Sequence, residues 1–202
     1  MRSFNTPHVP VTEPSAWVVR HAGLVPAVGP VLDVACGNGR HARYFAARGH
    51  PVAAVDIDTV GVADLADQPG VLVLQADLEH GSWPFAPGGF AGIVITNYLH
   101  RPHFPVVPGT LRQGGVLIFE TFAGGNEQFG RPRNPDFLLA AGELLAVFSP
   151  LLQIVAYEHG IEYSPRPAVR QRLVAIRQSA PVALLGPAGN DPSVQDDALR
   201  GL

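Results

Sequence analysis

The sequence predicts an α/β fold built on a single sheet that is mostly parallel and ends in an antiparallel strand. Short apolar runs recur along the chain, and they are continuous rather than alternating, as expected for parallel strands covered on both faces. A helix-length amphipathic segment separates the first two runs, which is the spacing of a βαβ unit. The last two runs are joined by about ten residues without a helical pattern, so we expect them to pair antiparallel.

The predicted elements follow one another along the chain. Residues 40–48 form the first crossover helix, because Ala42 and Phe45 share one face and Gly49 supplies a stop after it. Residues 15–24 are a second candidate helix. The predicted strands cover residues 31–35, 51–56, 71–75, 92–96, 116–121, 151–158 and 169–178.

Length and composition limit the domain count and the class of protein. The chain has 202 residues, 47% of them hydrophobic and 15% charged, which is typical of one globular domain. We expect this domain to span residues 15–178, with flexible segments at 1–14 and 179–202. A net charge of −3 argues against a nucleic-acid partner. The single cysteine excludes an intramolecular disulfide, and no apolar run reaches the ~20 residues of a membrane span, so we expect a cytoplasmic protein.

The segment 31–42, VLDVACGNGRHA, carries the clearest ligand-binding pattern. A buried strand runs into a turn with Gly37 and Gly39 and then into a helix, whose N-terminal N–H groups suit an anionic group such as a carboxylate. Glycine lets the turn adopt positive φ and lets a ligand approach the main chain. Asp33 lies inside the apolar strand, where burying a carboxylate costs several kcal/mol, so we expect it to have a cationic or N–H partner.

Two further aspartates end the next two predicted strands. Asp56 lies about 20 residues after Gly37, where nucleotide-binding folds place an acidic residue that accepts hydrogen bonds from ribose hydroxyls. Asp77 follows the third strand. Because the carboxyl ends of parallel strands meet at one edge of a sheet, these aspartates mark the edge at which doubly wound folds bind ligands.

The strings VLDVACGNGRHA, VAAVDID and LQADLE resemble motifs I, post-I and II of class I S-adenosylmethionine (SAM)-dependent methyltransferases, over about residues 15–178. The strings GNGRHA, NYLHRP and ETF are similar to those of small bacterial methyltransferases of the tellurite-resistance-like group. The resemblance implies a Rossmann-like seven-stranded sheet with helices on both faces. It also implies SAM as the cofactor, S-adenosylhomocysteine as the product, and no metal.

The same resemblance implies roles for individual residues. Asp33 would meet the methionine amino group, Asp56 the ribose hydroxyls and Asp77 the adenine amino group. The glycine turn would wrap the methionine and the ribose, and Ile57 and Leu78 would lie against the adenine ring. The cofactor-binding set implied in this way is Asp33, Ala35, Gly37, Gly39, Asp56, Ile57, Ala76, Asp77, Leu78 and Asn97.

Other functions remain open at this point. Gly37, Gly39 and Ala42 also fit the dinucleotide motif of NAD-binding Rossmann enzymes. SAM is favoured over NAD because Asp33 has no use beside a pyrophosphate, Asp77 adds an acceptor on the base side, and the final antiparallel pair replaces the second mononucleotide half. A non-catalytic SAM-binding protein would keep the same donor site. An RNA or protein methyltransferase is the alternative to an enzyme with a small-molecule acceptor, which the compact chain favours.

The methyl acceptor is expected beside the segment that follows the fourth strand. This segment lacks the [D/N/S]-P-P-[Y/F/W] signature of enzymes that methylate nucleobase or glutamine amino groups, and its Y-L-H resembles the V-L-H of small-molecule methyltransferases. Tyr98 and His100 are the catalytic candidates. The loop 120–134 is long, carries two glycine hinges and is expected to act as a lid. The candidate substrate-binding residues are His103, Glu120, Arg131 and Arg133.

Each of these candidates has a plainer interpretation. Arg131 and Arg133 would then belong to a solvated loop with salt bridges to residues such as Asp136. His100 and His103 lack an evident third ligand for a metal. Methyl transfer from a sulfonium is an in-line displacement in which the protein mainly aligns the reactants and excludes water. We therefore expect little dependence of turnover on any single side chain outside the donor site, and a packing role for Cys36.

Overall fold

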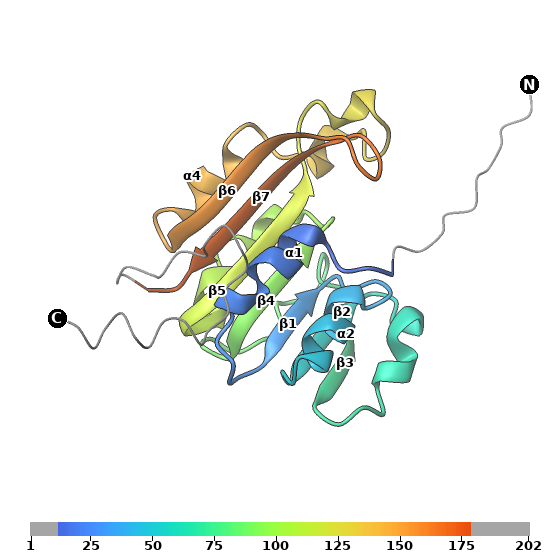
Figure 1. Cartoon of the computed structure of the whole chain (residues 1–202), viewed down its shortest axis with the longest axis vertical. Coiled ribbons are helices and arrows are strands. Elements are labelled where there is room, and N and C mark those ends of the chain that lie inside the picture. Colours follow the sequence, from blue (N-terminus) through green and yellow to red (C-terminus); the bar gives the residue numbers. More distant parts are fainter. Residues whose placement is uncertain (1–11, 179–202) are drawn as a thin grey trace, which may run out of the picture.

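The computed structural model describes residues 12–178, which form an α/β domain around a seven-stranded sheet of order β3-β2-β1-β4-β5-β7-β6 (Figure 1). Strand β7 runs antiparallel to both of its neighbours, β5 and β6, whereas the pairs from β3 to β5 are parallel. The predicted mixed sheet with an antiparallel C-terminal strand is therefore confirmed. Segment 179–202 and residues 1–11 of the expected flexible ends lie outside the described residues. The strands are β1 (Val31–Val34), β2 (Val52–Asp56), β3 (Val71–Gln75), β4 (Phe90–Thr96), β5 (Leu111–Phe122), β6 (Gln153–Glu162) and β7 (Ala168–Ile176).

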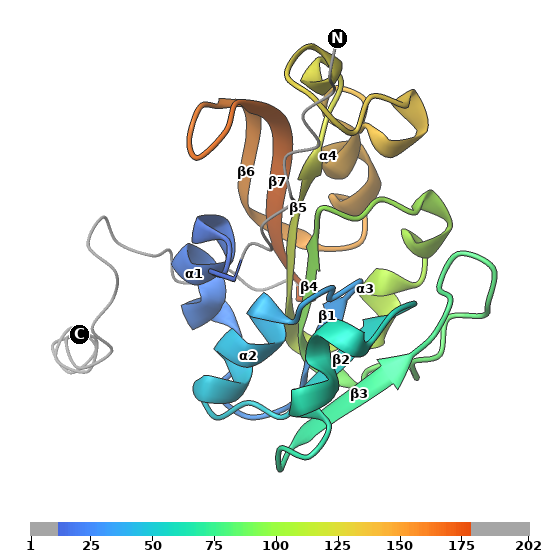
Figure 2. The same ribbon diagram turned by 90° about the vertical axis from the view of Figure 1, so that its right-hand side faces the viewer.

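Helices cover both faces of the sheet. Helices α1 and α2 lie on one face, and α3 and α4 lie on the other (Figure 2). Several connections are single turns of 3-10 helix rather than α-helices. The α-helices are α1 (Ala16–His21), α2 (Arg40–Ala47), α3 (Val107–Thr110) and α4 (Glu143–Phe148), and the 3-10 turns are η1 (Ala22–Leu24), η2 (Val60–Leu65), η3 (Arg101–His103), η4 (Asn126–Gln128) and η5 (Pro135–Phe137).

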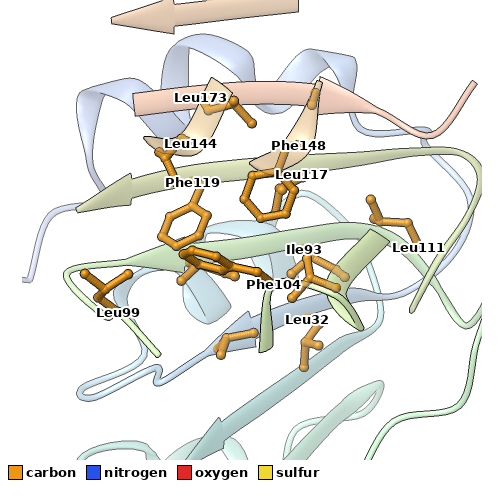
Figure 3. Close-up of a cluster of buried hydrophobic side chains, with 14 of the residues drawn as sticks. Leu32, Ile93, Leu99, Phe104, Leu111, Leu117, Phe119, Leu144, Phe148 and Leu173 are labelled. Carbon is orange, nitrogen blue, oxygen red and sulfur yellow. The ribbon is translucent and has the colours of Figure 1, made fainter. Parts of the chain in front are cut away.

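The larger hydrophobic core lies between the sheet and helices α3 and α4 (Figure 3). Three phenylalanines form its centre, with ring centroids 5.5 Å apart for Phe104 and Phe148 and 6.1 Å apart for Phe104 and Phe119. A second cluster packs α1 and α2 against the opposite face, where Phe45 is fully buried. The two cores hold the sheet rigid, so the carboxyl ends of its central strands have fixed relative positions.

The edge strand β3 differs from the prediction that every strand is covered on both faces. Leu72 is 58% exposed, and the residues of the strand are all half-buried or exposed. The physical reason is that no α-helix flanks this strand: the connection from β2 is the short turn η2, and an irregular loop follows β3. Trp83 and Phe85 in that loop supply partial cover to the core beneath it.

Strand β5 begins five residues earlier than predicted, at Leu111 rather than at residue 116. The sequence Gln113-Gly114-Gly115 interrupts the apolar pattern but not the strand. Gly115 has a packing role there, because a Cβ atom would lie 2.9 Å from the carbonyl oxygen of Phe90 in the neighbouring strand. The long β5 delivers Glu120 to the same edge of the sheet as the ends of β1 and β4.

Candidate cofactor and acceptor site

The turn between β1 and α2 is fixed to the end of β2 by a backbone hydrogen bond. The N–H of Gly37 donates to Asp56 Oδ2 at 2.7 Å, and the N–H of Asp58 donates to Asp56 Oδ1 at 3.1 Å. Gly37 has φ +56°, and a Cβ atom built on it would meet nothing within 4 Å. The turn therefore presents bare backbone to open space directly beside a half-exposed carboxylate.

The second glycine of the turn is constrained by packing as well as by its backbone conformation. A Cβ atom on Gly39 would collide with the Val62 side chain of η2, and the residue has φ +71°. Gly39 is thus required by the packing of η2 against the turn, whereas Gly37 is required by the backbone conformation. Both conditions keep the turn in one shape.

Asp33 has the N–H partner that its burial demands. It is 2% exposed, and its Oδ2 atom accepts a hydrogen bond of 2.9 Å from the N–H of Ala42 in the first turn of α2. Burial nevertheless raises the pKa of Asp33 from 3.8 to about 7, because the hydrogen bond from Ala42 offsets only part of this effect. A cation brought next to Asp33 would favour its ionised form.

Among residues 12–178, two residues other than glycine adopt left-handed backbone conformations, and both belong to the predicted cofactor set. Ala35 follows β1 with φ +52°, and Asn97 follows the neighbouring strand β4 with φ +55°. Such conformations cost about 1–3 kcal/mol each and cluster at ligand sites. The strained backbone lies at the centre of the carboxyl edge.

The expected adenine side has one free apolar surface. Ile57 is 62% exposed, whereas Leu78 is buried in the core and Ala76 is half-buried. The Oδ1 atom of Asp77 accepts hydrogen bonds from the N–H groups of Glu79 and His80, which together with the His80 side chain lower the pKa of Asp77. Ile57 and Asp77 therefore remain at the surface, whereas Leu78 belongs to the hydrophobic core.

A buried polar network beneath the turn was not anticipated from the sequence. The N–H of Ser15 donates to His41 Nε2 at 3.2 Å, and Ser15 Oγ donates to Glu120 Oε1 at 3.0 Å. Burial, with a smaller contribution from the charge of Arg40, lowers the pKa of His41 to about 3, so His41 is neutral. The network joins the N-terminal helix to motif I.

Glu120 belongs to this network rather than to an open acceptor pocket. It is 3% exposed and accepts a hydrogen bond of 2.5 Å from Arg172 Nε. Arg172 in turn forms ion pairs with Glu158 and Glu162. Its ion pair with Arg172 joins β5 to β7, and its contact with a substrate stays a prediction.

Arg40 is a further residue near the glycine turn that the sequence analysis did not single out. It is the first residue of α2 and directly follows the glycine turn. Its guanidinium group donates to the carbonyl oxygen of Glu13, and burial lowers its pKa while the charges of Glu120 and Asp33 oppose that shift. The string GNGRHA could have indicated this residue, because a side chain in the first turn of the helix lies beside the glycine turn that precedes it.

The structure brings Arg131, Arg133 and Asn97 together. They line a pocket of about 630 Å³ at the carboxyl edge, with Phe122, Pro132, Asn134 and Phe137 as its other walls. Neither arginine forms an ion pair with any residue in the described range 12–178. The proposed salt bridge to Asp136 is not formed.

Tyr98, His100 and His103 form a separate cluster away from the two arginines. They line a small cavity under the loop that follows β3. The ring centroids of His100 and His103 are 4.5 Å apart. Tyr98 Oη and His103 Nε2 are buried and have no hydrogen-bond partner among residues 12–178. Burial, followed by the charges of Glu79 and Asp77, raises the pKa of Tyr98 well above its usual range.

Cys36 packs in the core as predicted. It is 6% exposed, and burial raises the pKa of its thiol to about 12. Within residues 12–178, no group of three His, Cys, Asp or Glu side chains is placed to hold a metal ion. The helices of this part of the chain are all too short or too polar to cross a membrane.

Residues 31–113, from β1 into β5, match the family model of a methyltransferase domain. The match starts at the strand that carries Asp33 and includes Asp56 and Asp77. This part of the chain therefore carries the sequence features of a methyltransferase domain. Comparison with curated protein sequences gives no match.

Several solved structures share the fold of this chain. TehB from Haemophilus influenzae has a TM-score of 0.64 and 16% identity over 80% of this chain, and the chain spans 61% of TehB. The 1,6-didemethyltoxoflavin-N1-methyltransferase of Burkholderia thailandensis, with 1,6-didemethyltoxoflavin and S-adenosylhomocysteine bound, has a TM-score of 0.62 and 19% identity, covering 81% of this chain and 76% of that one.

A third similar structure is geranyl diphosphate C-methyltransferase from Streptomyces coelicolor A3(2), in complex with Mg²⁺, geranyl diphosphate and S-adenosylhomocysteine. Its TM-score is 0.62 and its identity 13%, covering 80% of this chain and 77% of that one. At such low identity these similarities show the class I methyltransferase fold alone.

Proposed function

We propose that this methyltransferase moves the methyl group of SAM to a small-molecule acceptor. The observation that carries the proposal is the arrangement of Asp33, Asp56 and Asp77 along the ends of three adjacent parallel strands, around a glycine turn whose backbone faces open space. The family match over residues 31–113 supports it, as do two of the similar structures, which contain a small-molecule substrate together with S-adenosylhomocysteine.

In this proposal each polar group of SAM has a partner in the protein with complementary charge or hydrogen-bonding capacity. The Asp56 carboxylate accepts the ribose hydroxyls, and a carboxylate has about four lone-pair sites, so its bonds from Gly37 and Asp58 leave room for them. Asp33 faces the methionine ammonium group. Arg40, at the start of α2, provides a cation for the methionine carboxylate. Ile57 packs against the adenine, with Asp77 at its amino edge.

When bound, SAM supplies a methyl group on a positively charged sulfur, which a nucleophile displaces in line. The chain's own contribution is alignment and the exclusion of water, which can supply effective molarities of about 10⁵–10⁸ M. No Asp, Glu or His side chain lines the arginine pocket. An acceptor that arrives as a ready nucleophile fits this lining. Tyr98 Oη is buried and His100 lines the separate small cavity, so we expect neither side chain to act as an acid or base on an acceptor in the arginine pocket.

The size of the pocket favours a small acceptor over a polymer. At about 630 Å³ it falls within the ~300–1,000 Å³ that small-molecule sites occupy. The net charge of −3 offers no general attraction to nucleic acid. RNA and protein acceptors therefore stand as the alternative outcome of the test below.

Transfer of label from methyl-labelled SAM tests the proposal. The purified protein is incubated with the donor and a size-fractionated cell extract, and label is counted in the small-molecule and macromolecular fractions. We expect label in the small fraction. It should be lost with Asp56→Asn and kept with Asp67→Asn, an exposed carboxylate outside the turn. Label in RNA or protein would contradict the small-acceptor assignment, and no label in any fraction would contradict catalysis.

A further inference from the structure

The pocket beside Asn97 offers hydrogen-bond donors and hardly any acceptors. Its lining contains Arg131 and Arg133, whose guanidinium groups have no ion pair within residues 12–178. The side-chain oxygen of Asn97 already accepts a hydrogen bond of 2.8 Å from Arg170, so its remaining amide group is the N–H donor. The side-chain oxygen of Asn134 is likewise engaged, by the N–H of Asp136 at 3.1 Å.

Two carboxylates near this pocket are already paired with other cations. Glu162 pairs with Arg170 at 3.0 Å, and Glu120 pairs with Arg172 at 2.5 Å. Arginine carries its charge at any physiological pH. The lining therefore has two positive charges and no negative one, which is an arrangement complementary to an anion.

The loop that carries the two arginines is anchored, which differs from the hinged lid that the sequence predicted. Asn126 is 1% exposed, and its amide donates to the carbonyl oxygen of Pro132, the residue between the arginines, at 3.1 Å. The Asn126 side-chain oxygen accepts from the N–H of Val169 in β7 at 3.2 Å. A buried polar residue thus holds the middle of the arginine segment against the sheet.

The opposite end of the pocket wall is clamped by Arg101. Its guanidinium group donates to the carbonyl oxygens of Asp136 at 2.7 Å and Leu138 at 2.9 Å, on both sides of Phe137. It also forms an ion pair with Glu143 at 2.7 Å. The pocket is therefore preformed, and this reduces the entropy lost when a ligand binds.

The remaining walls are apolar and suited to a flat or bulky body. Phe137 is 48% exposed, and Pro132 and Phe122 lie in the same lining. The guanidinium carbon of Arg170 lies 4.4 Å from the centroid of the Phe122 ring, which fixes that ring in place. An inorganic anion would leave these surfaces uncovered.

We infer that the acceptor is a small organic anion, with an apolar body between Phe122 and Phe137 and an acidic group on Arg131 and Arg133. The inference rests on the proposed function and adds the substrate class. Asn97 connects the two halves of the site, because it lines this pocket and also follows β4 in the strained conformation beside Ala35.

The test separates the small-molecule fraction of a cell extract by anion exchange into anionic and non-anionic pools, and each pool is incubated with the protein and methyl-labelled SAM. We expect label in products of the anionic pool. The variant Arg131→Gln/Arg133→Gln should lower that transfer by about tenfold or more, because hydrogen bonds to charged groups are among the strongest. Its affinity for S-adenosylhomocysteine, measured by calorimetry, should stay within about twofold of the parent value.

Arg166→Gln is the matched control, because Arg166 is an exposed arginine of the β6–β7 hairpin outside the pocket. It should leave transfer unchanged. Raising ionic strength should weaken acceptor binding in the parent protein and have little effect in the double variant. Label confined to the non-anionic pool, or transfer unaffected by the double variant, would overturn the inference while leaving methyl transfer standing. No label in either pool, with S-adenosylhomocysteine still bound, would overturn the proposed function and the inference with it.

Discussion

The backbone N–H of Gly37 donates a 2.7 Å hydrogen bond to the carboxylate of Asp56, which joins the turn after β1 to the last residue of β2. The contact holds the proposed ribose acceptor in place before any cofactor binds. It also fixes the orientation of the half-exposed Asp56 carboxylate, so that a bound ligand does not have to impose this orientation.

Replacing Asp56 by asparagine should raise the dissociation constant of S-adenosylhomocysteine by about tenfold or more, because hydrogen bonds to a charged acceptor contribute about 1.5–3 kcal/mol each. Isothermal titration calorimetry measures the change. Asp67→Asn, a substitution of the same chemistry at an exposed site, should have no effect. Equal affinities for the parent and Asp56→Asn proteins would show that Asp56 does not contact the ribose.

The affinity for SAM should rise with pH through neutrality. Burial raises the pKa of Asp33 to about 7, so the free protein holds a proton there that the methionine ammonium group must displace. With this pKa, affinity should increase by about tenfold between pH 6 and pH 8, and binding near pH 6.5 should release protons. Calorimetry in buffers with different ionisation enthalpies detects the release.

The same shift affects folding in the opposite direction. Because the folded-state pKa of Asp33 lies above its ordinary 3.8, its contribution to stability is greatest below about pH 4 and is lost as the pH rises through about 7.

Asp33→Asn should remove the pH dependence of cofactor affinity. A slope that persists in this variant would assign the proton to another group.

The two glycines of the turn should respond differently to alanine. Gly39→Ala should lower the free energy of unfolding by several kcal/mol, because its Cβ would collide with Val62 in addition to the strain at φ +71°. Gly37→Ala should cost only about 1–2 kcal/mol of stability, because its Cβ meets open space, yet it should weaken cofactor binding. Denaturant unfolding and calorimetry on both variants check this. Equal losses of stability would contradict the distinction.

Glu120 and Glu158 offer a matched comparison on one arginine. Both pair with Arg172, but the side chain of Glu120 is 5% exposed and that of Glu158 is 46% exposed. Glu120→Gln should destabilise the fold by about 1.5–3 kcal/mol, because it removes the most buried of the three carboxylates that pair with Arg172, while Glu158 and Glu162 remain. Glu158→Gln should cost less than about 1 kcal/mol. Chemical denaturation of the two variants measures the difference, and similar values would place Glu120 outside the structural network.

The proposed donor side of the site rests on sequence signals that are local. Asp56 and Asp77 come at or just after their strands, and the glycine turn lies between a strand and a helix that the apolar pattern reveals. The parallel order of the strands then brings these residues to one edge. The motif does not distinguish the two glycines of the turn. Only the packing shows that Gly37 faces open space and that Gly39 lies against Val62.

The acceptor side was less readable because it is assembled from distant segments. Ser15 and Glu120 are 105 residues apart in the sequence, and a side-chain hydrogen bond joins them. This contact makes Glu120 part of a buried polar network. Asn126 links Pro132 to Val169 in the same way. The long loop suggested a lid, but only these long-range contacts show that its arginine segment is fixed. The proposed preference for an anionic acceptor rests on the absence of ion-pair partners for Arg131 and Arg133 within residues 12–178, which sequence alone cannot establish.

Equilibrium binding of S-adenosylhomocysteine and NADH to the same protein tests the central claim most directly, because it compares the proposed methyl-donor site with the dinucleotide site that the glycine motif also permits. We predict one S-adenosylhomocysteine site per chain in calorimetry, weakened by Asp56→Asn, and no detectable NADH binding. Tighter binding of NADH than of S-adenosylhomocysteine, or S-adenosylhomocysteine binding that is indifferent to Asp56→Asn, would contradict the assignment of this edge as the cofactor site.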